Sequence, residues 1–426
     1  MSTLLGKLRR REAVFAANGL ADAIVTAPPR VDVPAPSWGD ASGSLSLVTD
    51  VGALGATHLS VEVASLDECV GQVRLGSALD ADMRLVSRLA LDTSFETLAG
   101  DGALYLDTET SGLGGAAANR AFLVGLAYYD PSRRGFVVEQ LLLRDLDDEP
   151  AMLEHVRRRI EAARFLVSYN GKSFDLPLLA ARSVLARVGP WPSRPHLDLL
   201  HVARRVHDRK RFRMSLGVVE RRVLAHERGP DISGEEVALR YAGYLFSGDE
   251  GPLGEVLVHN RHDVRSLIAL LAHYGREVDA LEGERPTNTS DLSRIARVMK
   301  RAGDLEWAKA FADRAVERAV SSEEAERHRV VLLSTTAEDD ASEALRTRAA
   351  IARSRGDRRG SVADLEALLA RAEDPDARLA LAKHYEHHLR DPARALEQVE
   401  RGTSEVPADS ALRRARLLRK LRRSQR

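Results

Sequence analysis

The stretch GALYLDTETSGLGG occupies residues 102–115 of the chain. Its apolar residues 103–106 predict a buried strand that ends at Asp107 and Glu109. Residues i and i+2 of a strand point to the same face, so the two carboxylates lie side by side. Buried ionised carboxylates repel each other and cost free energy unless a cation compensates them. The stretch therefore predicts a divalent-metal site whose remaining ligands come from elsewhere in the chain.

Two further stretches place acidic residues at the ends of predicted elements. LVSYNGKSFDLPLL, residues 166–179, puts Asp175 at the start of a helix that follows a buried strand. VLVHNRHDVRSLIALLAHY, residues 256–274, predicts a helix with Asp263 beside its apolar stripe and His259 one turn earlier. Each aspartate alone also has a structural explanation, as a helix-dipole partner or as an exposed residue. Together, four carboxylates on three elements predict a site for two hard cations, Mg²⁺ or Mn²⁺, which clamp an in-line phosphoryl displacement.

The order of the predicted elements indicates two kinds of domain. Between residues 101 and 280, three strands precede alternating helices and strands, which is typical of a mixed α/β sheet with flanking helices. Residues 1–100 include a Pro-, Ser- and Gly-rich stretch, and we interpret them as a partly irregular N-terminal extension. Residues 288–426 repeat small and apolar residues at the spacing of a tetratricopeptide helix pair, which predicts an all-α helical-repeat domain. An ordinary alanine-rich helical hairpin is the alternative for this last segment.

The composition of the 426-residue chain excludes several classes of protein. Lys and Arg number 63, as do Asp and Glu, so the net charge identifies no partner. The single cysteine, Cys69, excludes an internal disulfide framework, and we expect it to be a small core residue. No apolar run approaches the ~18 residues that span a bilayer, and the order of apolar and basic residues at the start is wrong for a secretory signal. We therefore expect a cytoplasmic protein without a membrane partner.

The three acidic stretches resemble the exonuclease motifs of the DEDD superfamily, and residues 100–275 more widely resemble the YprB-like ribonuclease-H-like proteins of bacteria. The matching motifs are Asp107-x-Glu109, Asn170-Gly171-x-x-Phe174-Asp175 and His259-x-x-x-Asp263. The resemblance implies a ribonuclease-H-like fold, removal of nucleotides from a 3′ end, and two divalent ions. It also implies a helical-repeat tail, which some members of the group carry.

The resemblance implies roles for single residues. The superfamily has a tyrosine four residues before the last aspartate, or a histidine five before it, so His259 stands in the tyrosine's place. A histidine is the better general base near neutral pH. Asn170 and Phe174 are expected on the substrate side, and Asp198 matches a recurring acidic position that supports the ligands. The implied metal ligands, which with His259 make up the catalytic set, are Asp107, Glu109, Asp175 and Asp263.

A basic segment, residues 204–213, predicts a contact with nucleic acid. Six of its ten residues are Lys or Arg, and we expect Arg204, Arg205, Lys210 and Arg211 to bind substrate phosphates. A solvated surface segment is the alternative. Aromatic residues make up only 5% of the chain, which favours recognition of the backbone at a single-stranded end over base stacking. The helical repeats would offer a surface to a protein partner.

These observations lead to one main hypothesis and two alternatives. The main hypothesis is a metal-dependent 3′–5′ exonuclease that hydrolyses phosphodiester bonds of DNA or RNA. The first alternative is a catalytically weak nucleic-acid-binding adaptor, which the unusual place of His259 favours. The second is a phosphodiesterase for short oligonucleotides. Four mutually repelling carboxylates argue against the adaptor, because binding alone gains nothing from them.

Overall fold

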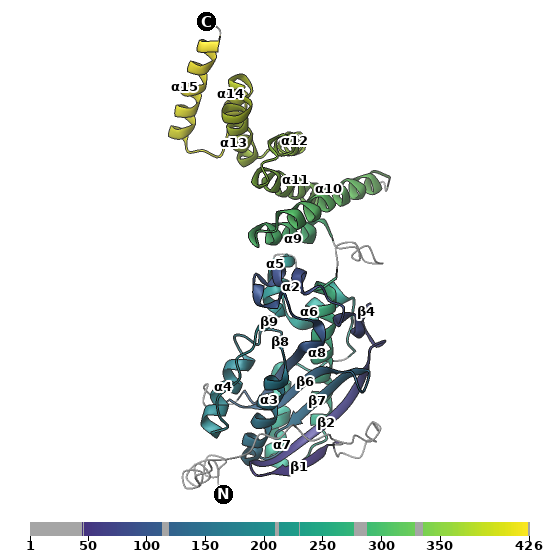
Figure 1. The fold of residues 1–426 in the computed structure, drawn as a ribbon. Helices are drawn as coiled ribbons and strands as arrows, with labels where there is room; N and C mark the ends of the chain where they lie inside the picture. Colours follow the sequence, from purple (N-terminus) through teal and green to yellow (C-terminus); the bar gives the residue numbers. More distant parts are fainter. Residues whose placement is uncertain are drawn as a thin grey trace. The chain divides into compact units, whose positions relative to one another are not determined.

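A computed structural model of the chain describes residues 45, 47–112, 119–208, 213–229, 231–276, 288–328 and 335–424. The strands are β1 Val48–Gly52, β2 Gly55–Ser65, β3 Cys69–Val70, β4 Val73–Arg74, β5 Ala103–Thr110, β6 Ala121–Asp130, β7 Gly135–Leu142, β8 Phe165–Ser168 and β9 His196–Asp198. Seven of them form one sheet in the order β1-β2-β7-β6-β5-β8-β9, and β3 pairs with β4 (Figure 1). Neighbours are antiparallel from β1 to β5, whereas β5, β8 and β9 are parallel.

Helices flank the sheet, which confirms the predicted mixed α/β architecture. Short 3₁₀ turns η2 to η5 and one π-helical turn, η6, connect the longer elements. The α-helices of this part are α2 Met83–Ala90, α3 Glu149–Ala162, α4 Asp175–Ala186, α5 Leu199–Val206, α6 Leu216–Val219, α7 Gly234–Ser247 and α8 Leu253–Tyr274. The turns are η2 Leu75–Ala78, η3 Thr93–Phe95, η4 Gly100–Gly102, η5 Leu146–Asp148 and η6 Glu220–Leu224.

Alternate residues of β5 belong to two different hydrophobic cores. Ala103 and Tyr105 pack with apolar residues of α2, α5 and the second half of α8. Leu104 and Leu106 pack with apolar residues of α3, α7 and the start of α8. Because side chains alternate along a strand, the two carboxylates at the end of β5 continue the face of Ala103 and Tyr105. They therefore lie on the face that the second half of α8 covers.

Residues 48–100, which the sequence assigns to an N-terminal extension, contribute two strands of the seven-stranded sheet and part of the core to this same domain. β2 pairs with β7 along its length, and β1 forms the edge of the sheet. Leu59 and Ala64 of β2 are buried, whereas Val63 is exposed, so the burial of this strand does not follow a simple period of two. The sheet thus begins well before residue 100, although the sequence analysis places the domain boundary at that residue. Cys69 is exposed, so the expectation of a core cysteine is wrong.

The C-terminal region is helical, as predicted. Each of its helices contacts the next one along the chain (Figure 1). Ala308, Ala312 and Ala315 are fully buried, which confirms that small residues allow the close approach of these helices. The helices are α9 Thr289–Arg301, α10 Leu305–His328, α11 Thr335–Ser354, α12 Arg358–Leu369, α13 Pro375–His384 with the π-helical turn η8 Tyr385–Leu389, α14 Pro392–Glu400 and α15 Pro407–Ser424.

Helix α9 packs directly on the α/β domain. The Nδ1 atom of His207 lies 2.8 Å from Asp291 Oδ2, and its Nε2 atom lies 2.9 Å from the hydroxyl of Tyr274. All three residues are buried. Apolar residues of α9 also join the core that contains the second half of α8. The first helix after residue 288 is therefore held by both polar and apolar contacts with the sheet domain.

Helix α8 approaches the sheet most closely at Gly125 on β6. A Cβ atom at this position would lie 2.3 Å from Asn260 Oδ1 and 2.7 Å from Val264 Cγ2. Gly125 is paired in register with Asp107 across β5 and β6. The missing side chain thus allows α8 to lie beside the acidic end of β5, which brings residues 107 and 263 together.

We expect Gly125→Ala to lower the free energy of unfolding by about 1–3 kcal/mol, because the added methyl group overlaps α8. Gly243→Ala is the control, since nothing lies within 4 Å of a Cβ atom at this helical position. Thermal unfolding followed by circular dichroism compares the two variants. A melting temperature of Gly125→Ala equal to that of the control would contradict the close approach of α8.

Candidate metal centre

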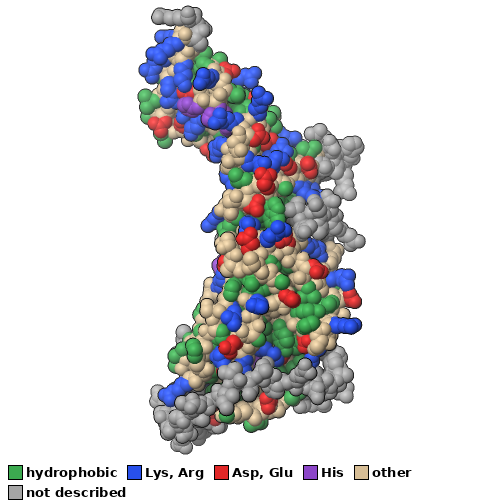
Figure 2. All heavy atoms as spheres, viewed as in Figure 1, with side chains coloured by type: hydrophobic (Ala, Val, Ile, Leu, Met, Phe, Trp, Pro, Cys, Tyr) green, Lys and Arg blue, Asp and Glu red, His purple; other side chains and the backbone are tan. Residues whose placement is uncertain are grey.

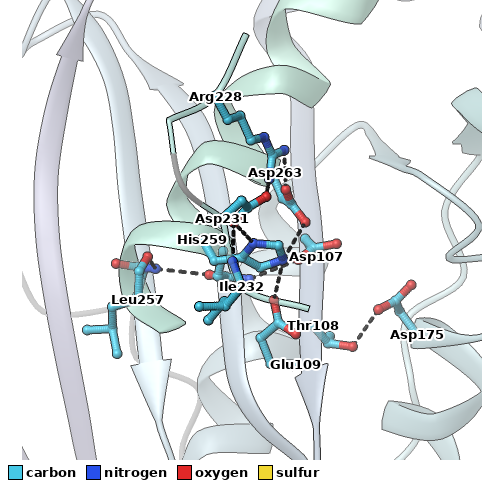
Figure 3. Close-up of polar contacts among 12 residues, drawn as sticks. Asp107, Thr108, Glu109, Asp175, Arg228, Asp231, Ile232, Leu257, His259 and Asp263 are labelled. Atoms are coloured by element: carbon cyan, nitrogen blue, oxygen red, sulfur yellow. Dashed lines mark hydrogen bonds and ion pairs between the residues drawn. The ribbon is translucent and has the colours of Figure 1, made fainter. Parts of the chain in front are cut away.

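Acidic side chains from three elements converge with His259 at the end of β5. Ligand atoms of Glu109, His259 and Asp263 all lie within 4.8 Å of one another (Figure 3). The Nε2 atom of His259 lies 3.7 Å from Glu109 Oε1 and 3.6 Å from Asp263 Oδ2. The structure thus brings three of the five predicted catalytic residues into one candidate ligand group. The other two, Asp107 and Asp175, lie near enough to influence this group through their charge.

Asp107 is fixed by a chain of buried amides that the sequence analysis does not identify. Asn260 donates from Nδ2 to Asp107 Oδ2 at 2.9 Å. Gln140 donates from Nε2 to Asn260 Oδ1 at 3.0 Å and to the carbonyl oxygen of Leu257 at 2.7 Å. Both amide side chains are buried. Because each amide is itself held, the orientation of the Asp107 carboxylate is set before any ligand binds.

Asp175 is fixed from the opposite side of β5. It is the first residue of α4 and is buried. Thr108, which lies between the two carboxylates of β5, donates its hydroxyl to Asp175 Oδ1 (Figure 3). Alternation along the strand directs Thr108 away from the face of its two acidic neighbours. β8 pairs with β5 only as far as Tyr105, so Asp175 lies beside the part of β5 that has no β8 neighbour.

Asp198 holds the loop that precedes Asp175, which agrees with its predicted supporting role. Its carboxylate is 2% exposed and accepts hydrogen bonds from the backbone N–H groups of Asn170 at 2.8 Å and Lys172 at 3.1 Å. Asn170 adopts a left-handed backbone conformation with φ of 70°. A Cβ atom on Gly171 would lie 2.3 Å from Ser168 Oγ, so this turn also requires glycine.

The residues predicted to bind substrate have different surroundings. Phe174 is 49% exposed at the start of α4, directly before Asp175. Arg204 is partly buried on α5. Arg205 donates instead to a backbone carbonyl oxygen of α2 at 3.2 Å, and its burial lowers its pKa. The guanidinium of Arg205 is therefore engaged in packing rather than presented to a phosphate. The remaining two predicted residues, Lys210 and Arg211, lie outside the described residues.

Arg228 and Asp231 support the site, although the sequence analysis does not single them out. Arg228 donates to both Asp263 and Glu220, and it forms an ion pair with Asp231 at 3.1 Å. Asp231 Oδ1 lies 2.5 Å from His259 Nδ1. Glu220 is fully buried in the π-helical turn η6, so its carboxylate holds the guanidinium of Arg228 in place. This contact of Asp231 directs the other ring nitrogen of His259 toward the carboxylates.

Burial makes ionisation of the four carboxyl groups unfavourable. It raises the pKa of Glu109 to about 7, although the charge of His259 opposes the shift. It raises the pKa of Asp175 to about 6, although a hydrogen bond from Thr108 opposes the shift. Burial and the three neighbouring carboxylates raise the pKa of Asp107 well above its ordinary value. The pKa of Asp263 is also raised by burial, even beside Arg228 and His259.

The pKa of His259 changes in the opposite sense from that of an isolated buried histidine. Burial lowers it, but the carboxylates of Asp263, Asp231 and Glu109 outweigh burial and give a net rise. The neighbouring carboxylates therefore favour the protonated form of the imidazole. Even with His259 and Arg228 beside them, burial keeps the pKa of every carboxyl group in the cluster raised.

The donor set fits a hard divalent cation. Carboxylate oxygens suit Mg²⁺ and Mn²⁺, and a divalent ion would stabilise the ionised carboxylates that burial and mutual repulsion disfavour. Asn260 donates a hydrogen bond to Asp107, and Thr108 donates one to Asp175. Hydrogen bonds of this kind orient metal ligands in other proteins.

Comparisons with known proteins agree with this geometry. Residues 104–274 match a protein family described as "RNase_H superfamily". "Uncharacterized protein YprB" of Bacillus subtilis (strain 168) is 30% identical over 308 residues, which is 71% of this chain and 69% of that protein. The chain belongs to the ribonuclease H superfamily. Membership of the ribonuclease H superfamily supports a nuclease-type activity and the binding of nucleic acid. None of the described helices is long and apolar enough to cross a membrane.

We expect Glu109→Gln to stabilise the metal-free form of this ribonuclease-H-like protein at pH 8. The folded-state pKa of about 7 lies above the ordinary value of 4.5, so the free energy of unfolding falls as the pH rises between these values. Removing the ionisable group should restore roughly 1–3 kcal/mol at pH 8 and nothing at pH 4. Thermal unfolding in a chelator measures the effect, with the exposed Glu397→Gln as the control. A Glu109→Gln variant that melts no higher than wild type at pH 8 would contradict the raised pKa.

Proposed function

We propose that this protein is a metal-dependent 3′–5′ exonuclease that hydrolyses phosphodiester bonds of DNA or RNA. The observation that supports this most strongly is the convergence of Glu109, His259 and Asp263 on one point beside Asp107 and Asp175. A fold held together only for stability gains nothing from four buried carboxylates with raised pKa values. A nuclease gains the ability to hold divalent ions against the phosphate of its substrate.

The residues of the site divide the chemistry between them. Asp107, Glu109, Asp175 and Asp263 would hold two Mg²⁺ or Mn²⁺ ions, which supply charge neutralisation for an in-line phosphoryl displacement when bound. His259 would accept a proton from the attacking water at Nε2, because Asp231 occupies its Nδ1 atom. The carboxylates keep the pKa of His259 high in the metal-free site. Neutralising them removes the cause of that rise and favours the neutral imidazole that a general base requires.

We assign Phe174 and Asn170 to the contact with the last nucleotide of a strand. Phe174 is exposed immediately before Asp175, so its ring can stack on a terminal base. Asn170 occupies the tight turn that Asp198 holds. A single exposed aromatic ring beside the carboxylates suits the recognition of one chain end rather than of an extended strand. The preference for a 3′ end comes from the likeness to the exonuclease motifs.

One observation favours the adaptor that binds nucleic acid without efficient cleavage. Arg228 already forms an ion pair with Asp263, so its guanidinium occupies one oxygen atom of a proposed metal ligand. An ion that binds there must share Asp263 with Arg228 or displace it. The degradation assay below separates the adaptor from the exonuclease.

We expect the wild-type protein to shorten 5′-labelled single strands from the 3′ end in Mn²⁺ or Mg²⁺ and to leave them intact in a chelator. Asp107→Asn should lower the rate by at least about 100-fold, because it removes one charge from the proposed metal ligands. Gel electrophoresis of labelled DNA and RNA measures the product ladder and also chooses between the two substrates. Asp101→Asn is the control, since Asp101 is exposed just before the same strand. Unchanged cleavage by Asp107→Asn would refute the proposed site, and intact strands in every lane would favour the adaptor.

A further inference from the structure

The C-terminal helices form a basic cavity, half open to solvent, in addition to the carboxylate site. The cavity has a volume of about 260 Å³, several times the ~30 Å³ share of one water molecule in the liquid. It is lined by the methyl group of Ala380 and by five basic or histidine side chains, which are Arg353, Lys383, His384, His387 and His388. None of these lining residues is acidic. Figure 2 shows the histidines of this region gathered among Lys and Arg side chains on one face.

One residue that lines the cavity, His384, has a buried ring nitrogen without a hydrogen-bond partner among the described residues. His384 is 4% exposed, and its Nε2 atom lies 3.4 Å from the hydroxyl oxygen of Ser361. Its Nδ1 atom has no hydrogen-bond partner among the described residues. A buried polar atom left unpaired costs about 1–3 kcal/mol, so this site favours a bound ligand or water. Burial lowers the pKa of His384, and the nearby charges of His388 and Arg353 lower it further, which indicates a positive field in the cavity.

Two cations of the cavity form no ion pair with a described residue, although Arg413 and, more weakly, the charge of Lys383 lower the pKa of Glu405. Among the residues that the structure describes, no ion pair involves Arg353 or Lys383, and both are exposed. The nearest acid in sequence, Glu386, lies 3.5 Å from the ring of His387 but is fully buried. Its charge is already shared by three other cations, which are Arg413, Arg416 and Lys420. The cavity therefore presents unbalanced positive charge.

The surroundings of the cavity favour a polyanion over a metal ion. His384 and His388 are one helical turn apart, with ring centroids 5.5 Å apart, a spacing that metal sites also use. The guanidinium of Arg353 and the ammonium of Lys383 would repel a metal cation from the same space. Residues 375–424 carry twelve Lys and Arg against seven Asp and Glu, although the chain as a whole is balanced. Because this excess of positive charge extends beyond the cavity, it suits a chain of phosphates better than one isolated anion.

We propose that this cavity binds a backbone phosphate of single-stranded nucleic acid. Arg353 and Lys383 supply the charge, and the exposed rings of His387 and His388 supply hydrogen-bond donors. The C-terminal helices then hold the strand at a second site, which does not depend on cleavage by the carboxylate site. The phosphate group of a phosphorylated protein has the same charge, and the experiment separates it from nucleic acid.

The test is the binding of fluorescently labelled single-stranded DNA and RNA to the full-length protein in a chelator, measured by anisotropy. Arg353→Gln combined with Lys383→Gln should weaken binding by about tenfold, since two phosphate contacts are lost. Arg401→Gln combined with Arg419→Gln is the matched control, because it removes two exposed arginines of the same region that do not line the cavity. The control should change the dissociation constant by less than about twofold. Melting temperatures should equal that of wild type for both variants, because all four side chains are exposed.

Three results would overturn the proposal. An equal loss of affinity in both double variants would assign binding to the basic surface in general. Unchanged affinity in the cavity variant would remove the cavity from nucleic-acid binding. Displacement of the labelled strand by a singly phosphorylated peptide at a lower concentration than by the unlabelled strand would assign the cavity to a protein partner. Because the measurement is made in a chelator, each of these results is independent of whether the protein degrades nucleic acid.

Discussion

The repulsion among four buried carboxylates is the constraint on which the rest of this structure depends. Ionised acids in a buried cluster oppose folding, and burial raises the pKa of each one. The fold holds them in place by giving each carboxylate at least one partner from another part of the chain. The pairs are Asp107 with Asn260, Asp175 with Thr108, Glu109 with His259, and Asp263 with Arg228. The remaining negative charge is what a divalent cation would neutralise.

The sheet and its nearest helix bring these partners together. β5 has an antiparallel neighbour on one side and a shorter parallel neighbour on the other, so its acidic end extends past β8. Ligands of α/β sheets commonly bind at the carboxyl ends of parallel strands, and this is where the loop held by Asp198 lies. Gly125 allows α8 to lie against β6 at the same level. Residues separated by more than 150 positions in sequence thereby share one site.

Local sequence patterns could predict the elements and the acidic residues, but not the contacts between them. The apolar stripe of residues 256–274 predicts a helix, and the structure has it at Leu253–Tyr274. Arg228 and Asp231 lie outside any periodic segment, and only the folded chain shows that they bind Asp263 and His259. Arg205 also has a contact that its charge pattern does not predict, because its guanidinium donates to a backbone carbonyl oxygen of α2. Propensity and charge act locally, whereas these partners are chosen by tertiary structure.

The measurement that tests this account most directly is calorimetric titration of Mn²⁺ into the metal-free protein at pH 8 and at pH 6. The account predicts saturable binding that is at least about tenfold weaker at pH 6, because protons compete for ligands. The pKa of Glu109 is about 7 and that of Asp175 is about 6, so both bind protons within this interval. Absence of saturable binding at pH 8, or equal affinity at the two pH values, would contradict the account.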